Sequence, residues 1–232
     1  MKTFSLFAIA LFMFQFTFGQ AVRDRNVIPV AVNLNQVLRM TINNGGNIEF
    51  NFNTIDQYKT GISGDQATSS SAGTATSNPM YVTDFVIASS TRWKLTYGAE
   101  QGTFIGTDNP SNTLALDNVG FSITESGTHE FEASAAAKGS NATSELYSAA
   151  TDNGNDISAL EAYPVDIIED NDSGTQANAG DESDNAFQFI WRCGTIEGTT
   201  TPMNAQNLID QNPSPTSDRY VVNVLFDLSI DN

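Results

Sequence analysis

Alternation of apolar and polar residues with a period of two is the feature that most constrains the fold of this chain. In residues 47–53, Ile48, Phe50 and Phe52 fall on one face, and polar residues fall on the other. Because successive side chains of a strand point to opposite faces of its sheet, this pattern indicates a half-buried strand. Such alternation is typical of antiparallel sheets, since parallel strands covered on both faces are apolar throughout.

The same alternation recurs along the chain. It is present in residues 26–34, 37–42, 119–123, 185–192 and 219–231. Helical periodicity is nearly absent, and only residues 156–163 and 201–213 fit short helices. Several short strands with turn-rich connections predict an all-β fold, an antiparallel β-sandwich of Ig-like or jelly-roll-like type with at most short helices. A closed barrel is the alternative.

The first 19 residues predict a signal peptide. Lys2 precedes an apolar run, and Thr17 and Gly19 supply the small residues of a cleavage site. The run is shorter than the roughly 20 residues of a membrane span, and an uncleaved anchor is the alternative. We therefore expect residues 20–232 to form a single β-sandwich domain that is exported and has no membrane span.

The cysteine content and the charge narrow the class of protein. Cys193 is the only cysteine, so no internal disulfide is available, and we expect its thiol to be buried. Export without a disulfide framework is more typical of bacterial proteins than of animal ones, which predicts a secreted, surface or periplasmic protein of a Gram-negative bacterium. The 27 acidic and 10 basic residues give a net charge of −17, which favours solubility and disfavours nucleic acid as a partner.

Two stretches are predicted to be flexible surface loops. Residues 60–79 are small and polar, and residues 134–185 are rich in Ala, Ser, Asn and Asp. Such compositions bury little apolar surface. We therefore expect the second stretch to form a long acidic loop insertion in the sandwich.

Residues for catalysis are scarce, so we expect the chain not to be an enzyme. His129 is the only histidine and is expected to be a solvated residue at a strand end. The sequence has no G-x-S-x-G motif and too few His and Cys residues for a zinc site. A pair of carboxylates for glycoside hydrolysis stays open, because the sequence gives no separations between them.

One acidic pattern suggests calcium. Asp170 and Asp172 precede Gly174 in a D-x-D-x-G order, and Asp181 and Asp184 form a second cluster. Oxygen ligands on alternate residues, closed by a glycine turn, are typical of calcium loops. The four aspartates are therefore candidate calcium ligands, and a solvated acidic loop is the alternative.

One predicted strand carries aromatic and basic side chains that are rare in this chain. Trp93, Leu95 and Tyr97 share one face, and Arg92 and Lys94 share the other. A sugar-binding platform needs flat aromatic rings facing solvent, whereas these rings share their face with a leucine. The pattern therefore favours aromatic side chains that face the core and basic side chains that face the solvent.

Two short motifs carry a family resemblance. Trp93, Lys94 and Leu95 match a W-x-L triplet, and residues 220–228 match a closing Y-x-V-x-V-x-F-x-L strand. With these motifs, the chain resembles secreted β-sandwich surface proteins of Bacteroidota, with WxL-like and fimbria-like domains. A second triplet is missing, because Trp191 is not followed by x-Leu. The resemblance implies a surface or extracellular structural module.

The function that we expect is structural. Residues 26–34 and 220–232 can pair inside their own sheet or with an open edge of another subunit. We therefore expect a non-catalytic, secreted or cell-surface structural or adhesion protein, a fimbria-like subunit that assembles through edge strands with itself or with other surface proteins. The alternative is a carbohydrate-binding module for a polysaccharide, calcium-assisted, with Tyr147 and Tyr163 as its candidate aromatic residues.

Overall fold

The computed structural model of the chain describes residues 28–64, 68–69, 73–74, 79–132, 138–148, 157–172, 177–198 and 201–231. The chain divides into two compact units, Met1–Asn35 and Gln36–Asn232. In the first unit, residues 28–35 have no regular secondary structure, and the predicted signal peptide lies outside the described residues. The second unit carries every strand and helix named below.

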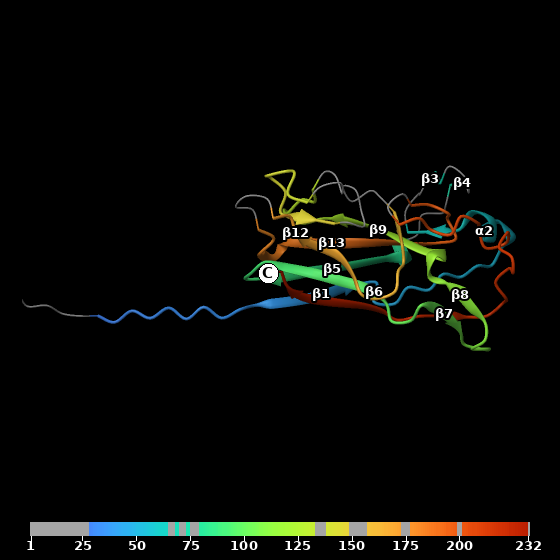
Figure 1. Ribbon diagram of the computed structural model, residues 1–232, viewed down its shortest axis with the longest axis horizontal. Helices are drawn as coiled ribbons and strands as arrows, with labels where there is room; N and C mark the ends of the chain where they lie inside the picture. The colour runs from blue at the N-terminus through green and yellow to red at the C-terminus, as the bar shows by residue number, and fades with distance from the viewer. Residues whose placement is uncertain are drawn as a thin grey trace, which may run out of the picture. The chain divides into compact units, whose positions relative to one another are not determined.

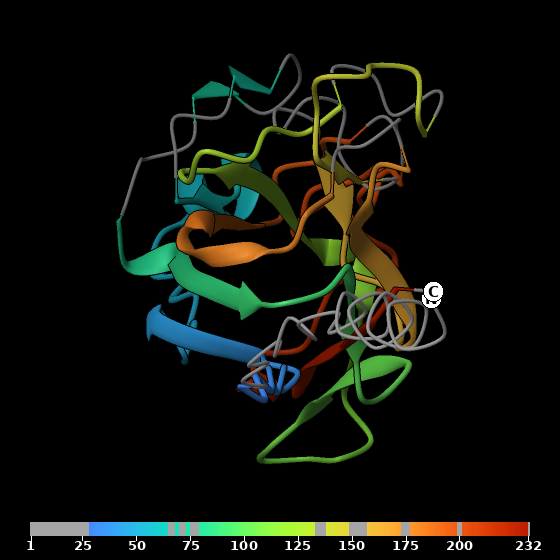
Figure 2. The same cartoon turned by 90° about the vertical axis from the view of Figure 1, so that its left-hand side faces the viewer.

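Two antiparallel sheets build the second unit (Figure 1). The larger sheet has the order β1–β5–β13–β9–β11, and β2 also pairs with β13. Its strands are β1 (Leu38–Asn44), β2 (Ile62–Ser63), β5 (Val82–Ser89), β9 (Val119–Glu125), β11 (Ser158–Ala159) and β13 (Gly180–Cys193). The smaller sheet runs β10–β12–β6–β15 and consists of β6 (Trp93–Ala99), β10 (Leu146–Tyr147), β12 (Val165–Asp170) and β15 (Val224–Ile230). In Figure 2, β1, β5 and β13, coloured blue, green and orange, follow one another in one layer.

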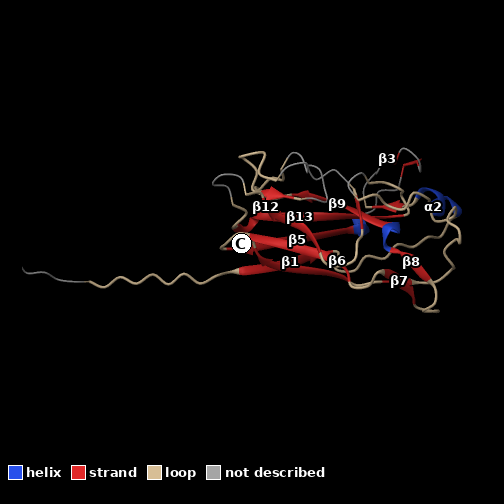
Figure 3. Cartoon of the chain, viewed as in Figure 1, coloured by secondary structure: helices blue, strands red, loops and turns tan. Residues whose placement is uncertain are grey.

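The remaining elements are short. A three-stranded sheet consists of β7 (Thr103–Gly106), β8 (Thr113–Ala115) and β14 (Tyr220–Val221), and β3 (Thr68–Ser69) pairs with β4 (Gly73–Thr74). The helical pieces are α2 (Ile55–Thr60) and the 3-10 turns η1 (Pro79–Tyr81) and η2 (Leu116–Asn118). Strands dominate the unit, as Figure 3 shows, and the predicted all-β antiparallel sandwich is confirmed. No helix in the described parts of the chain is long and apolar enough to cross a membrane.

Aromatic side chains fill the space between the two sheets. Trp93, Leu95 and Tyr97 of β6 are at most 1 % exposed. The ring of Tyr97 meets that of Phe121 edge-on with centroids 5.1 Å apart, and Trp93 meets Phe187 in the same way at 5.9 Å. Such edge-to-face pairs are favourable geometries for buried rings. The aromatic set of β6 therefore faces the core, as its alternation predicts.

The prediction that residues 134–185 form one flexible loop is wrong. Strands β10, β11, β12 and the first part of β13 all lie within this range. Ile167 and Ile168 of β12 are fully buried, and β12 is an internal strand of the smaller sheet. One short apolar run thus buries enough surface to form a strand, although its surroundings are polar. Within the other expected loop, residues 60–79, Ile62 and Ser63 pair with β13.

Neither predicted helix forms in the described residues. Ser158 and Ala159, in the middle of the first candidate, form β11 and pair with β9. Residues 201–213, the second candidate, form turns and bends. The backbone N–H of Asn204 there donates to the carbonyl of Asp117, on another segment of the chain, at 2.8 Å. In both places, bonds to other segments override a short local pattern that is too weak to hold a helix alone.

Two predicted strands do not join a sheet, whereas the terminal one does. Residues 28–34 are exposed and outside any strand, and residues 47–53 keep their alternation but form no ladder. By contrast, the residues from Val224 to Ile230 pair with β6 of the same chain. The terminal strand therefore completes its own sandwich, which was one of the two alternatives that the sequence left open.

Candidate functional site

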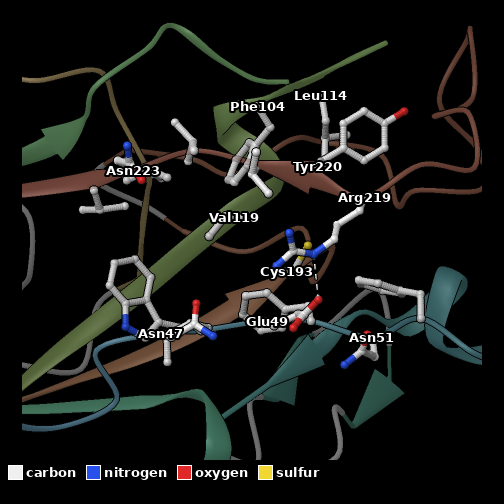
Figure 4. Close-up of a pocket in the computed structure, with 18 of the residues that line it drawn as sticks. Asn47, Glu49, Asn51, Phe104, Leu114, Val119, Cys193, Arg219, Tyr220 and Asn223 are labelled. Carbon is white, nitrogen blue, oxygen red and sulfur yellow. Dashed lines mark hydrogen bonds and ion pairs between the residues drawn. The ribbon is translucent and has the colours of Figure 1, made fainter. Parts of the chain in front are cut away.

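A cleft opens at the end of the sandwich where β1 ends and β15 begins. It has a volume of about 710 Å³ and lies between two extended stretches, residues 45–53 and 215–226. The side chains that line its interior include Phe50, Phe52, Phe104, Leu114, Val119, Leu160, Trp191, Cys193, Val222 and Phe226. Figure 4 shows the polar residues Asn47, Glu49 and Asn51 along one lip and Arg219 on the other. An apolar interior with polar lips is typical of a binding site.

The first wall of the cleft, residues 45–53, is anchored at both ends. A side chain at Gly45 would place its Cβ 1.9 Å from the carbonyl oxygen of Val82, and φ is +68° there, so only glycine allows the turn out of β1. At the other end, the N–H of Gln57 donates to Thr54 Oγ1, and the Gln57 side chain accepts from the N–H of Thr54. This capping box fixes the start of α2 and therefore the end of the wall.

Between its anchors, the first wall has the form of a strand without a neighbour. Ile48, Phe50 and Phe52 are half-buried and pack against the core, and the ring of Phe50 stacks on Tyr81 with centroids 4.5 Å apart. In the described structure, residues 47–52 make no backbone-to-backbone hydrogen bond, and of their carbonyls only that of Asn51 accepts a side-chain bond, a long one of 3.4 Å from Asn53 Nδ2. An extended segment with unpaired N–H and C=O groups is a template for the addition of another strand.

The second wall, unlike the first, has backbone hydrogen-bond partners in its own chain. Tyr220 and Val221 pair with β7, and the carbonyl of Asn223 accepts from the N–H of Glu100 at 2.8 Å. The wall then continues as β15, which is the last strand of the smaller sheet. The cleft therefore lies between the unpaired first wall and the edge of the smaller sheet.

An ion pair joins the two lips across the mouth of the cleft, as Figure 4 shows. Arg219 Nε donates to Glu49 Oε1 at 3.0 Å, and the two side chains are 60 % and 47 % exposed. A pair as exposed as this one contributes at most about 1 kcal/mol, because solvent screens it. The lips are thus joined by a contact that opens at little cost.

Asp218 fastens the second wall to the turn between β7 and β8. Its carboxylate accepts hydrogen bonds from the N–H groups of Asp108 at 2.9 Å and Asn109 at 3.2 Å, and from the Asn112 side chain at 2.9 Å. The bonds from Asp108 and Asn112 favour the charged form and hold the pKa of Asp218 below its ordinary value of 3.8. The carboxylate is therefore ionised at neutral pH and holds the turn.

Cys193 lies on the floor of the cleft and is 4 % exposed, which confirms the prediction of a buried thiol. Burial raises the pKa of Cys193 to about 12. Because the thiolate is the nucleophilic form, a thiol that stays protonated at neutral pH is unsuited to nucleophilic catalysis.

The structure brings the four predicted calcium ligands together in two pairs. Arg92 contacts Asp170 at 3.1 Å and Asp172 at 3.3 Å. Asp181 and Asp184 each accept from the backbone N–H of the other, at 3.3 and 3.0 Å. Among the described residues, no group of three or more His, Cys, Asp or Glu side chains could hold a metal ion. Calcium binding stays a prediction, which a melting temperature measured with and without calcium tests.

The two outward basic residues at the start of β6, Arg92 just before it and Lys94 within it, meet acidic residues of their own chain. Besides the contacts of Arg92, Lys94 Nζ lies 3.4 Å from Asp166 Oδ2. Thr96 also donates to Asp166 at 2.7 Å, and this bond, followed by the charge of Lys94, lowers the pKa of Asp166. The outer face of the smaller sheet is thus a set of internal charge pairs.

The remaining predicted residues lie apart from the cleft. Tyr147 is half-buried on β10, and Tyr163 is 37 % exposed with its hydroxyl donating to Asp227 at 3.1 Å. His129 Nδ1 lies 3.0 Å from Asn185 Oδ1. None of these residues lines the cleft.

Sequence reasoning missed the cleft and a set of buried polar residues. Asn171, which is fully buried, donates to Glu132 Oε2 at 2.9 Å, and Arg192 pairs with Glu197 in the interior. No sequence signal separates these residues from solvated ones, because polar residues in a polar stretch are usually exposed. The alternation in residues 47–53 was a signal for the cleft, but it does not tell whether a neighbouring strand exists.

No model of a known protein family matches this chain, and no curated protein matches it. The resemblance carried by the W-x-L triplet and the closing strand therefore stays an expectation.

Proposed function

We propose that this chain is a non-catalytic structural or adhesion subunit, secreted or displayed on the surface of a Gram-negative bacterium, that self-associates by strand addition. One observation carries the proposal. Ile28, Val30, Val32 and Leu34 recur at every second residue and are between 75 % and 90 % exposed. Full burial of each such side chain contributes about 1.5–3 kcal/mol, so their exposure favours association with a partner.

The sheets supply suitable partners for such a segment. β1 is one of the two edge strands of the larger sheet, and β15 is one of the two edge strands of the smaller sheet. Edge strands and unpaired extended segments bind added strands through main-chain hydrogen bonds, and alternate side chains then fill pockets. The cleft beside residues 47–52 offers both an unpaired backbone and an apolar interior.

The state of the reactive side chains supports a non-catalytic role. The Cys193 thiol is protonated at neutral pH because burial raises its pKa to about 12. His129, the only histidine, is engaged with Asn185 and lies outside the cleft. Neither side chain is arranged as a nucleophile with an adjacent base.

The oligomeric state of the mature chain, residues 20–232, tests the proposal. We expect light scattering to show a mass that rises with protein concentration, and negative-stain microscopy to show linear assemblies. A variant that carries Gln101→Glu, an exposed position in the turn between β6 and β7 and outside the cleft, serves as a surface control and should assemble like the wild type. A wild-type chain that stays monomeric at all accessible concentrations would contradict self-association.

A further inference from the structure

The geometry points to one specific contact: residues 28–34 of one copy enter the cleft of a second copy as an added strand beside residues 47–52. This inference rests on the proposed function, because it names the donor and the acceptor through which the subunit assembles. It joins the two predicted strands that the single chain leaves without a sheet.

The acceptor has the properties of a sheet edge that lacks one strand. Residues 47–52 direct Ile48, Phe50 and Phe52 toward the core while their backbone groups make no backbone hydrogen bond in the described structure. The two walls leave about 710 Å³ between them, lined largely by apolar side chains. An added strand would satisfy the free backbone groups and fill this space at once.

The donor has the complementary properties. Its apolar side chains, Ile28, Val30, Val32 and Leu34, occupy one face of an extended strand, and Ala31 and Asn33 occupy the other. Pro29 lacks an N–H group and therefore fits at the first residue of a strand, with the residues that pair following from Val30 onward. The segment has no other described residues of its own unit to pack against, apart from Asn35.

Chain length excludes the cleft of the same copy. Only three residues separate Leu34 from Leu38, the first residue of β1. The cleft opens beyond Asn44, at the other end of this seven-residue strand, which spans roughly 23 Å at about 3.3 Å per residue. A segment that turned back at residue 35 would run along β1 and end before it reached residues 47–52. The acceptor is therefore a second copy.

The separation between the donor segment and the cleft on one copy also determines what kind of assembly forms. In the second unit, β7, β8 and α2 lie at the cleft end, and the start of β1 lies at the opposite end, where Leu38 pairs with Ser89 (Figure 1). The contact thus joins two different surfaces of identical chains. Such a head-to-tail contact repeats without limit unless its rotation closes a ring, so linear filaments are expected.

Charge favours the same contact. Residues 20–36 carry Arg23, Arg25 and Asp24 as their only charges, a net charge of +1. Residues 37–232 hold 7 of the 10 basic residues and 26 of the 27 acidic ones, a net charge of −19. The donor end of one copy is therefore attracted to the body of the next, and the attraction weakens with salt.

A pair of matched double variants of the mature chain tests the donor. Val30→Asp with Val32→Asp adds two charges to the apolar face of the donor, the face that would enter the cleft, and is called the inward variant. Ala31→Asp with Asn33→Asp adds the same two charges to the opposite face and is called the outward variant. All four positions are exposed outside the core, so neither variant disturbs the fold. We expect the inward variant to raise the concentration for assembly by about tenfold or more, and the outward variant to assemble like the wild type.

Disulfide crosslinking between two mixed populations tests the acceptor. One population carries Ala31→Cys on the donor, and the other carries Asn47→Cys or Asn51→Cys, two exposed positions on the lip of the cleft. In the control, the second population carries Ser126→Cys, an exposed position directly after β9 and outside the cleft. We expect crosslinked dimers with a lip cysteine and none with the control.

Two results overturn the inference but leave the proposed function standing. The first is assembly that is equal for the wild type and the inward variant. The second is assembly without any lip crosslink, which would place the contact on another surface. A wild-type chain that never assembles overturns both the inference and the proposed function.

Discussion

Asn178 completes the start of β6 by bonding both backbone groups of Trp93. The N–H of Trp93 donates to Asn178 Oδ1 at 3.1 Å, and Asn178 Nδ2 donates to the carbonyl of Trp93 at 2.7 Å. The indole Nε1 in turn donates to the Asn178 carbonyl at 2.8 Å. Since the ladder between β6 and β12 ends at Leu95, the side-chain amide takes the place of a neighbouring strand for one residue.

Removal of this amide should destabilise the fold. In an Asn178→Ala variant, the N–H and C=O of Trp93 lose their partner in a fully buried site. Each unsatisfied buried group costs about 1–3 kcal/mol, so we expect a loss of roughly 2–5 kcal/mol in the free energy of unfolding. Denaturant unfolding followed by tryptophan fluorescence measures this loss. Asn223→Ala removes one exposed amide and should change stability by less than about 0.5 kcal/mol; equal losses would contradict the assignment.

Loss of one partner of a buried ion pair should also lower the free energy of unfolding. Arg192 and Glu197 form an ion pair, and their side chains are only 1 % and 8 % exposed. Glu197→Ala removes a carboxylate that pairs with the buried charge of Arg192, and the loss of one partner of a buried pair typically costs about 3–5 kcal/mol. Thermal and denaturant unfolding measure the loss. Glu49→Ala breaks the exposed pair with Arg219 and should cost at most about 1 kcal/mol. A similar cost for both variants would show that burial does not make the pair of Arg192 and Glu197 more important for stability.

The sequence could predict those parts of the fold in which alternation coincides with a partner strand. Trp93 and Tyr97 point inward because a strand with one apolar face must bury it, and the partner β15 follows the same rule. Alternation specifies which side chains of a segment are buried. It carries no information on whether another segment supplies hydrogen bonds. Residues 28–34 and 47–53 were therefore predicted to be strands, but in the structure they join no sheet.

The candidate site could be predicted only in part for the same reason. The inward set of Ile48, Phe50 and Phe52 was evident, but the cleft exists because no described strand covers them. Asn178 and Arg192 gave no signal, since their burial depends on contacts with residues far away in the chain. Composition alone assigned the surroundings of β12 to a loop, whereas pairing with β6 decided the outcome.

The hydrogen bonds that the Asp218 carboxylate accepts from the turn between β7 and β8 should make this end of the protein less stable in acid. Its folded-state pKa lies below 3.8, so this carboxylate contributes stability that is fully present above its unfolded pKa and is lost as the pH falls through the folded pKa. An Asp218→Asn variant should be less stable than the wild type at pH 7. The difference should begin to shrink below about pH 4, near the pKa of an unfolded aspartate, and should disappear below the folded pKa, where the wild-type carboxylate is also neutral.

Melting temperatures of both proteins between pH 7 and pH 2.5 measure this convergence. Asp56→Asn, on the exposed surface of α2, serves as a control for the change in net charge. A difference that stays constant or widens toward low pH would show that the hydrogen bonds of Asp218 do not depend on its charge.

The thiol on the floor of the cleft should react slowly while the protein is folded. With a pKa of about 12, Cys193 has a very small thiolate fraction at pH 8, whereas an unfolded thiol with a pKa of about 8.5 is substantially ionised. We therefore expect a disulfide-exchange reagent to label native Cys193 at least about a hundredfold more slowly than the unfolded chain. An Asn51→Cys variant, whose new thiol lies on the exposed lip, should gain one fast-reacting group and keep the slow one. Rapid labelling of native Cys193 would mean that the floor is open to solvent and would reopen the case for a reactive thiol.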